Sequence, residues 1–459
     1  MNPASTMLNA MHARSRPLPT RPRPPVWKWL LPAALVLGGG WGAWYWASRP
    51  HDPPVQTAAL SRTASQDWRG LQAFGPRPVG SEGHDRAEEW LADQFRALGY
   101  PVTEQPVTLE RPYDRGGTLK VGSLSVPAAA LYGSRGGEQE GRLVRLPSGA
   151  TSEQMEARGL RGQIALTTCQ EWDGEGVTRR DLVERATQAG ALGLVLVQDC
   201  AVRQLQRVPA TPLPLVQVSA ADGAKVLPLA GQPARLTSKV EVREVKGHNL
   251  IAARVEAKPE VLFGAHLDSV NDSPGANDNA SGVLAVLEAA REAARTPLAD
   301  RAWFVLFDAE EDGLVGSRAF VDAHRYPLRQ TRAMLNLDMV GVNVEPLGVA
   351  AHAELLPLAR RVRPGVRVFE DEAATRRETF GRSMNISGNS DQVPFQSWGV
   401  RTVFIHRGLD RNYHAATDLT LSPALVREAG DFAVKLAQAV LAAPWTPDEP
   451  CEGFRSGGC

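Results

Sequence analysis

The sequence of 459 residues predicts an α/β fold, in which a sheet flanked by helices is interrupted by a small β-rich inserted domain. Two patterns and the length predict it. From residue 249 onward, apolar strands alternate with helices, which is typical of an α/β sheet. Between residues 109 and 240, short strand-like runs and glycines are frequent and helices are few. The chain is also too long for one ordinary core, so two folded units are expected.

The α/β region is marked by regularly spaced apolar runs. Candidate strands cover residues 250–255, 261–265, 303–307, 333–338 and 402–406, and candidate helices cover residues 282–294 and 423–441. Upstream of the insertion, Trp90, Leu91, Phe95 and Leu98 share one face of a helix expected at 87–98. The α/β domain is therefore expected to comprise residues 67–108 and 241–445. Within the insertion, 109–240, strands are expected at 163–168, 192–197 and 214–218 and a helix at 181–189.

An uncharged run, residues 29–47, follows a basic segment. Residues 1–28 contain Arg14, Arg16, Arg21, Arg23 and Lys28 and no acidic residue. As a helix the uncharged run would reach ~28 Å, which matches the hydrocarbon core of a bilayer, and its tryptophans cluster towards both ends, as at membrane interfaces.

We therefore expect a transmembrane signal anchor at 29–47, with residues 1–28 as a disordered cytoplasmic tail and 48–66 as a linker. The rest of the chain would be extracytoplasmic, in the periplasm or outside the cell, and would end in a short tail, 446–459. A cleaved signal peptide is disfavoured because the run ends in bulky aromatic residues. A buried soluble helix is the other alternative.

Charge and cysteine content narrow the possible partners. Lysine plus arginine and aspartate plus glutamate number 51 each, so a general attraction to nucleic acid is not expected. Cys169 and Cys200 form one set of cysteines, and Cys451 and Cys459 form another. Pairing within each set suits an oxidising compartment, although free buried thiols are the alternative for the first set.

Potential metal ligands follow several of the expected strands. His266 and Asp268 end the strand that begins at residue 261, and their spacing of two directs both side chains to one face. An aspartate there can fix the second ring nitrogen of a ligating histidine. Asp278 lies among small residues directly before a helix. One interpretation is that Asp278 interacts favourably with the dipole at the start of this helix. A role at the helix end alone does not explain why small residues lie on both sides of Asp278.

Glu310 and Glu311 follow the strand at 303–307 and point two carboxylates in different directions. One could bind a metal while the other faces an activated water; a solvated acidic loop is the alternative. Asp338 ends another apolar strand, where a buried charge requires a partner. Tyr413 and His414 follow the strand at 402–406, with His406 as a competing histidine. These side chains share the edge of the sheet where α/β folds build their sites, and their nitrogen and oxygen donors suit zinc.

Together these segments resemble the family of di-zinc aminopeptidases, whose superfamily also contains glutamate carboxypeptidases, glutaminyl cyclases and transferrin receptor. The resemblance rests on the ordered motifs His266-Leu267-Asp268, Asp278 to Gly282, Glu310-Glu311, Asp338 and Tyr413-His414. It implies a mixed, mostly parallel central sheet, a peptide substrate and two zinc ions per chain. The insertion resembles a protease-associated domain.

The resemblance also implies roles for the residues. Asp278 would bridge the metals, His266 and Asp338 would complete one site, and Glu311 and His414 the other. Glu310 would be the general base, Asp268 would orient His266, and Tyr413 would donate to the oxyanion. In Ser390-Asp391-Gln392, glutamine stands where many relatives carry histidine.

Three alternatives to an aminopeptidase belong to the same superfamily. A cyclase is disfavoured because relatives of that type usually show Trp, where this chain has Tyr413. A non-catalytic receptor would lack ligands, and here all five ligands are present. A carboxypeptidase would need a cationic pocket for the substrate carboxylate, and Arg376, Arg377, Arg382 and Arg401 leave that reading open.

Overall fold

The computed structural model describes residues 51–131, 133–173, 179–198, 213–369 and 390–445. The chain divides into two units, residues 1–51 and 52–459, and apart from His51 the described residues belong to the second. The expected anchor at 29–47 and both expected tails lie outside the described residues. Among the residues that are described, no helix is long and apolar enough to cross a membrane.

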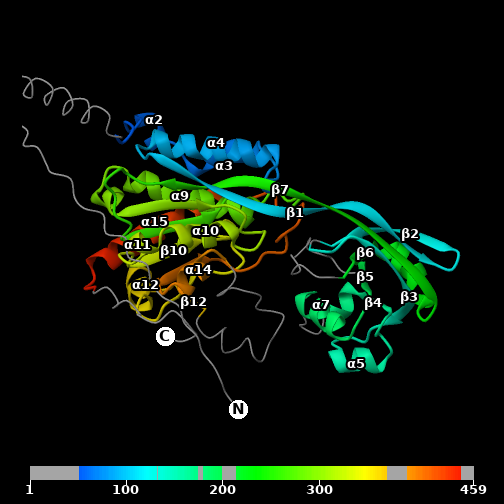
Figure 1. Ribbon diagram of the computed structural model, residues 1–459. Helices are drawn as coiled ribbons and strands as arrows, with labels where there is room; N and C mark the ends of the chain where they lie inside the picture. The colour runs from blue at the N-terminus through cyan, green and yellow to red at the C-terminus, as the bar shows by residue number, and fades with distance from the viewer. Residues whose placement is uncertain (1–50, 132, 174–178, 199–212, 370–389, 446–459) are drawn as a thin grey trace, which may run out of the picture. The chain divides into compact units, whose positions relative to one another are not determined.

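The central sheet is mixed and mostly parallel, as predicted (Figure 1). Its middle consists of four parallel strands in the order β9 (Ala302–Phe307), β8 (Val261–His266), β10 (Ala333–Leu337) and β13 (Thr402–His406). Antiparallel strands flank them, namely β7 (Pro233–Ala252) beside β9 and β11 (Gly348–Ala351) beside β13, with β12 (Arg367–Val368) outermost. The parallel strands are buried on both faces, which explains why their sequences are apolar without alternation.

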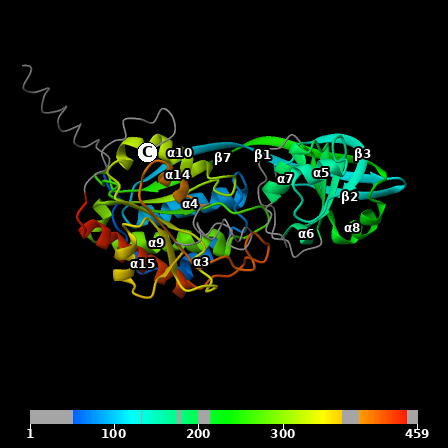
Figure 2. The ribbon, with the colours of Figure 1, turned by 90° about the horizontal axis from the view of Figure 1, so that it is seen from below.

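Helices cover both faces of this sheet. The larger core joins it to α3 (Ala64–Gln72), α4 (Glu82–Ala97), α9 (Ser281–Ala293) and α15 (Pro423–Ala442), whereas α10 (Val315–Ala323) and α14 (Gln392–Ser397) pack on the other face. In Figure 2, α10 and α14 lie on one side of the strands and α9 and α15 on the other. Neighbouring strand residues alternate between the cores: Phe263 faces the first and Leu262 the second.

The helix predictions at 282–294, 423–441 and 87–98 are confirmed as α9, α15 and α4, with shifts of a few residues. α4 begins earlier than expected because the Ser81 side chain caps it, accepting a hydrogen bond from the His84 backbone N–H. Shorter helices complete the domain: α2 (Thr57–Leu60), α11 (Arg325–Leu328) and α12 (Leu356–Val362).

Two strands of 20 residues each were not expected at that length. β1 (Val102–Val121) pairs antiparallel with β7, from Val102 opposite Ala252 to Val121 opposite Ala234, with an irregularity between Asp114 and Gly117. The expected domain boundaries at 109 and 240 fall inside these strands. Many of their side chains are exposed, so no long apolar run signals them in the sequence.

The inserted segment contains β2 (Leu124–Ala130), β3 (Gly137–Arg145), β4 (Ile164–Thr168), β5 (Gly193–Gln198) and β6 (Leu215–Ser219). The last four pair in parallel in the order β3, β4, β5, β6. Four helices accompany them, α5 (Ser152–Ala157), α6 (Cys169–Asp173), α7 (Arg179–Gln188) and α8 (Ala220–Val226), so the described part of the insertion holds more helix than we expected. Separate apolar cores lie on the two faces of these strands.

Cys169 is buried and disulfide-bonded. This agrees with the expectation that the first set of cysteines, Cys169 and Cys200, is oxidised, although Cys200 lies outside the described residues.

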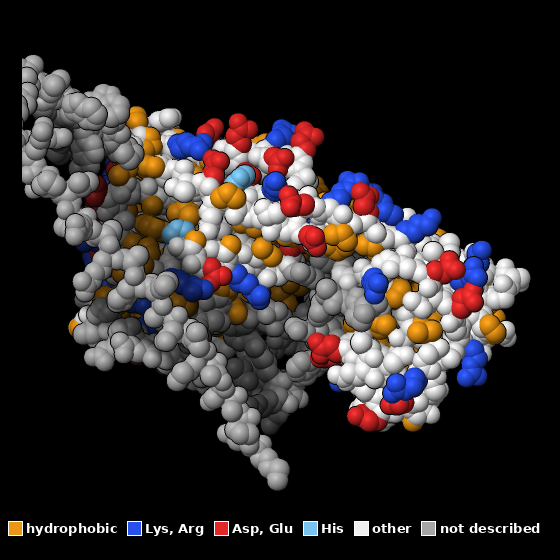
Figure 3. All heavy atoms as spheres, viewed as in Figure 1, with side chains coloured by type: hydrophobic (Ala, Val, Ile, Leu, Met, Phe, Trp, Pro, Cys, Tyr) orange, Lys and Arg blue, Asp and Glu red, His pale blue; other side chains and the backbone are white. Residues whose placement is uncertain are grey.

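On the face shown in Figure 3, acidic and basic side chains are interspersed. That surface agrees with the balanced formal charge of the sequence.

Candidate metal centre

All five predicted ligands gather at the carboxyl ends of the parallel strands. His266 is the last residue of β8, and Asp338 directly follows β10. Glu311 lies four residues beyond the end of β9, and His414 lies in the loop after β13. Asp278 belongs to η2 (Ala276–Ala280), the turn that leads into α9. Because β8, β9, β10 and β13 are parallel, these loops leave the sheet at one edge.

Asp278 lies between the two histidines. Its Oδ1 is 3.2 Å from His266 Nε2, and its Oδ2 is 3.2 Å from His414 Nε2. Each histidine also faces a second carboxylate: His266 Nε2 is 3.6 Å from Asp338 Oδ1, and His414 Nε2 is 3.0 Å from Glu311 Oε2. The five side chains therefore form two sets, each with one imidazole and one further carboxylate, which share Asp278.

This donor set fits divalent cations. Ligand atoms of His266, Asp278 and Glu311 lie within 4.8 Å of one another. Glu311 Oε1 and Asp338 Oδ1 are buried and accept no hydrogen bond within the described part of the chain, a costly arrangement unless a cation binds them. Imidazole nitrogens combined with carboxylate oxygens are zinc ligands in proteins.

The local electrostatics also attract positive charge. Burial opposes protonation of His414, yet Glu311 and Asp278 raise its pKa to about 10. Desolvation raises the pKa of the Glu310 carboxyl well above its ordinary value, and the neighbouring Glu311 and Asp391 carboxylates reinforce the effect. A centre with this surplus of carboxylates is stabilised by bound cations.

Glu310 lies beside the predicted ligands. One of its oxygens is within 4.8 Å of ligand atoms of both His266 and Asp338.

Backbone strain accompanies the ligand positions: Ala309, Met339 and His414 all have left-handed φ values of 53–55°. For residues other than glycine this conformation is costly and is retained where the surroundings enforce it.

Asp268 contacts both His266 and the loop that carries the two glutamates. The Nδ1 atom of His266 is 3.2 Å from the backbone carbonyl of Asp268 and 3.6 Å from its Oδ1. The Asp268 carboxylate accepts hydrogen bonds from the backbone N–H groups of Glu310 (3.1 Å) and Glu311 (3.2 Å). Asp268 thus connects the His266 loop to the loop that carries the two glutamates.

Tyr413 stacks on His414, with ring centroids 3.8 Å apart.

The competing histidine, His406, is buried between Phe369 and Phe404, and burial lowers its pKa to about 3. Its Nδ1 accepts a hydrogen bond from the Gly408 backbone N–H. His406 is therefore a core residue of β13.

Several residues around the centre gave no signal in the sequence. The Asn277 side chain donates to Asp410 and accepts from the Gly341 backbone, and so joins three ligand-bearing loops. The Asp418 carboxylate accepts the backbone N–H groups of Asn277 and Asp278. Polar residues of this kind are common in loops, so only their contacts reveal them.

The Ser390 to Gln392 segment lies behind the centre. Ser390 Oγ donates to Asp338 Oδ2 at 2.8 Å, and Gln392 Oε1 accepts from Asn336 Nδ2 at 2.9 Å. Gln392 is thus buried against β10.

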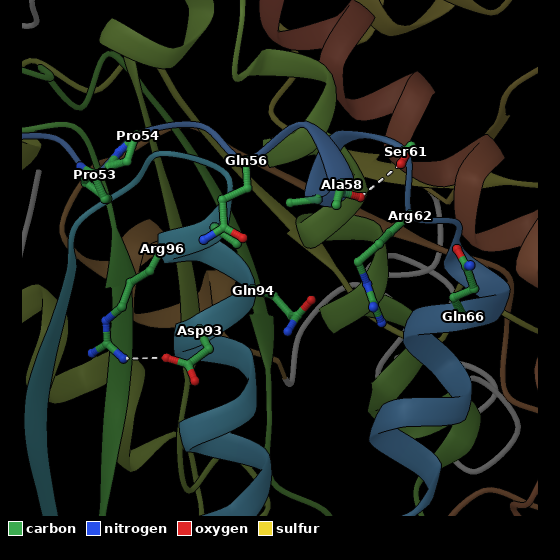
Figure 4. A pocket seen from close by; sticks show the side chains of 12 residues that line it. Pro53, Pro54, Gln56, Ala58, Ser61, Arg62, Gln66, Asp93, Gln94 and Arg96 are labelled. Atoms are coloured by element: carbon green, nitrogen blue, oxygen red, sulfur yellow. Dashed lines mark hydrogen bonds and ion pairs between the residues drawn. The ribbon is translucent and has the colours of Figure 1, made fainter.

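A cavity of about 730 Å³ lies away from these ligands, lined by residues of α2, α3 and α4 and the segment before them (Figure 4). Its arginines are paired, Arg62 with Asp67 and Arg96 with Asp93. The cavity contains no histidine and none of the predicted site residues.

Residues 249–437 match the model of peptidase family M28. This part of the chain therefore resembles an M28 peptidase domain. Aminopeptidase YwaD of Bacillus subtilis (strain 168) is 27% identical over 384 residues, which cover 79% of this chain and 80% of that protein. The probable lipoprotein aminopeptidase LpqL of Mycobacterium tuberculosis is 27% identical over 335 residues, which cover 69% of this chain and 65% of that protein.

Solved structures agree. An aminopeptidase from Aneurinibacillus sp. strain AM-1 superposes with a TM-score of 0.62 at 25% identity, covering 85% of this chain and 97% of that chain. BSAP, a zinc aminopeptidase from Bacillus subtilis, gives a TM-score of 0.64 at 24% identity, covering 82% and 94%, and shares the fold. The predictions of the family, the α/β fold and a zinc-dependent exopeptidase of the aminopeptidase family are confirmed. Zinc is the cofactor of the M28 domain.

Proposed function

We propose that the chain is an aminopeptidase that holds two zinc ions and releases residues from the free amino terminus of peptides. The observation that carries the proposal is Asp278, with one oxygen 3.2 Å from each of two histidines. His266 and Asp338 complete one zinc site with Asp278, and Glu311 and His414 complete the other. When bound, the zinc ions would lower the pKa of a water and polarise the substrate carbonyl.

Glu310 acts as the general base. Its carboxylate accepts a proton from the attacking water as the oxygen bonds to the carbonyl carbon, and it returns that proton to the amine nitrogen as the C–N bond breaks. Its position near His266 and Asp338 supports this role. The hydrogen bonds from the Glu310 and Glu311 backbone to Asp268 hold the base and the ligand in fixed relation.

Tyr413 donates its phenolic proton in a hydrogen bond to the oxygen that becomes negative in the transition state. Stacking on His414 keeps its ring beside the centre. Burial, together with Asp278 and Glu311, raises the pKa of Tyr413 well above its ordinary value, so the phenol remains a donor. Such donors typically stabilise the transition state by about 3–4 kcal/mol.

Separate substitutions of Glu310 and Glu311 test these roles. Glu310→Gln should keep zinc content and melting temperature but lower kcat by at least ~10²–10⁴-fold, because only proton transfer is lost. Glu311→Ala should lose zinc as well as activity, whereas the exposed Glu244→Gln should change nothing. Near-normal turnover in Glu310→Gln, or a loss of zinc as large as in Glu311→Ala, would show that the roles are wrong.

Blocked peptides test the direction of cleavage. Carboxyl-blocked peptides should be hydrolysed and amino-blocked peptides should not. The reverse preference would identify a carboxypeptidase, and ring closure of amino-terminal glutamine peptides would identify a cyclase.

For location, we propose that residues 29–47 anchor the enzyme in a membrane, with the M28 domain and a protease-associated-like insertion outside the cytoplasm. The basic flank and terminal tryptophans of that run support the anchor. The disulfide at Cys169 suits an oxidising compartment.

The structure suggests where to cut the chain for a test. Asp52 Oδ1 accepts the Val255 backbone N–H, and the Gln56 N–H donates to Ala97 O, so the cut belongs before Asp52. A chain beginning at Asp52 should be soluble and active, whereas the full chain should sediment with membranes. A full chain that stays in the soluble fraction would disprove the anchor.

A further inference from the structure

Asp308 immediately follows β9 and precedes Ala309, Glu310 and Glu311. It is fully buried. Its backbone N–H donates to Asn249 Oδ1 at 2.9 Å, and its carbonyl accepts the Gly316 N–H at 2.9 Å. Its Oδ1 accepts the Ala309 N–H at 2.9 Å. Asp308 is therefore fixed by its backbone and by its side chain at the start of the segment that carries both glutamates.

Two glycines leave room for this residue. A Cβ atom added to Gly247 would lie 1.9 Å from Asp308 Oδ2, and one added to Gly316 would lie 2.2 Å from the Asp308 carbonyl oxygen. Neither position tolerates a side chain while Asp308 stays in place. Asp308 thus occupies a closely fitted site, with its carboxylate against β7 and its backbone carbonyl against α10.

His84 provides the partner for the buried carboxylate. Its Nε2 lies 2.8 Å from Asp308 Oδ1, and both side chains are fully buried. His84 belongs to the first turn of α4, more than 200 residues before Asp308 in the chain. A buried carboxylate that loses its partner is strongly destabilised, so this contact controls where Asp308 lies.

The far end of the same segment is held by other contacts. Asp268 accepts the N–H groups of Glu310 and Glu311, and the Glu310 carbonyl accepts the Gly313 and Leu314 N–H groups. Between the two anchors, Ala309 has a left-handed φ of 53°. A segment held in this strained conformation needs both anchors, because release of either lets the backbone relax.

We infer that His84 is a positioning residue of this peptidase: through Asp308 it sets the placement of Glu310 and Glu311. The inference rests on the roles proposed above for these two glutamates. Loss of the contact should displace the base and one zinc ligand together, and a displacement of about 1 Å can lower turnover ~10²-fold.

Two polar replacements of similar character test the contact. In His84→Gln the side-chain amide can take the place of Nε2 and still donate to Asp308, whereas the shorter Asn amide reaches only the Nδ1 position. We expect His84→Gln to keep kcat within about threefold of the wild type, and His84→Asn to lose ~10–100-fold in kcat with little change in KM.

Zinc retention is the second readout. In titrations with a chelator, His84→Asn should release one of its two zinc ions more readily than the wild type, because Glu311 belongs to one site only. His324→Asn is the control: His324 stacks on Phe320 and bonds the Phe320 backbone carbonyl, and among the described residues it makes no contact with the 308–311 segment. It should lose stability without a change in kcat or zinc retention.

If both His84 variants match the wild type in kcat and zinc retention, or change only in melting temperature as His324→Asn does, the positioning role is wrong. The two proposals can fail separately. An active Glu310→Gln would refute the catalytic roles, whereas zinc release from His84→Asn would still report on the placement of Glu311.

Discussion

Replacement of Arg77 by methionine should destabilise the fold by about 3 kcal/mol. Arg77 lies between Pro76 and Pro78 and is fully buried. Its guanidinium donates to three carbonyls of the stretch between His266 and Asp278: Leu267 at 2.9 Å, Pro274 at 2.6 Å and Gly275 at 3.0 Å. Methionine fills the space of the stem but donates nothing.

The magnitude follows from two opposing contributions. Each buried carbonyl left without a donor costs about 1–3 kcal/mol, or about 6 kcal/mol for three at mid-range. Against this, burial, partly offset by nearby carboxylates, lowers the pKa of Arg77 to about 10 from 12.5, which corresponds to a net cost of roughly 3 kcal/mol for the buried charge that methionine relieves. The difference is a net loss of about 3 kcal/mol.

Urea denaturation of the metal-free chain is the appropriate measurement, because zinc bound to the folded state would add to the apparent stability. Arg69→Met is the control, since Arg69 is exposed and, among the described residues, bonds the Ser65 hydroxyl. We expect it to change stability by less than about 0.5 kcal/mol. If Arg77→Met falls within that same range, the three carbonyls have other partners and the reasoning is refuted.

Two further predictions concern zinc and pH. Metal analysis should find about two zinc equivalents per chain, and a chelator should abolish hydrolysis and lower the melting temperature. The melting temperature should fall because a ligand at 100 times its Kd adds ~2.7 kcal/mol to stability. Full activity with a single zinc would contradict the shared role of Asp278. Although burial opposes its charge, Asp308 raises the pKa of His84 to about 9 in the folded state, above the unfolded value of about 6.5. The stability from this pair should therefore be complete below about pH 6.5 and lost as pH rises through about 9. Urea midpoints of the wild type and His84→Asn should differ more at about pH 6 than at about pH 10, and an unchanged difference would show that His84 stays neutral.

The amino-acid sequence indicated the α/β domain and predicted a set of metal ligands that the structure brings together. β8, β9, β10 and β13 are short, apolar and buried on both faces, so composition alone marks them. Polar residues at the ends of such strands stand out against the apolar background. His266, Asp338 and the glutamate pair were found for this reason.

The tertiary structure decided which atoms meet. Only the folded structure shows that the two oxygens of Asp278 face different histidines, His266 and His414. It also brings together residues more than 100 positions apart, as in the hydrogen bond from Arg77 to Leu267 and the contact of His84 with Asp308. The length of β1 and β7 also went undetected, because each strand stabilises the other while exposing much of its surface. Periodicity reports which face of an element is buried; the partner across the interface depends on how the whole chain packs, and no local pattern encodes it.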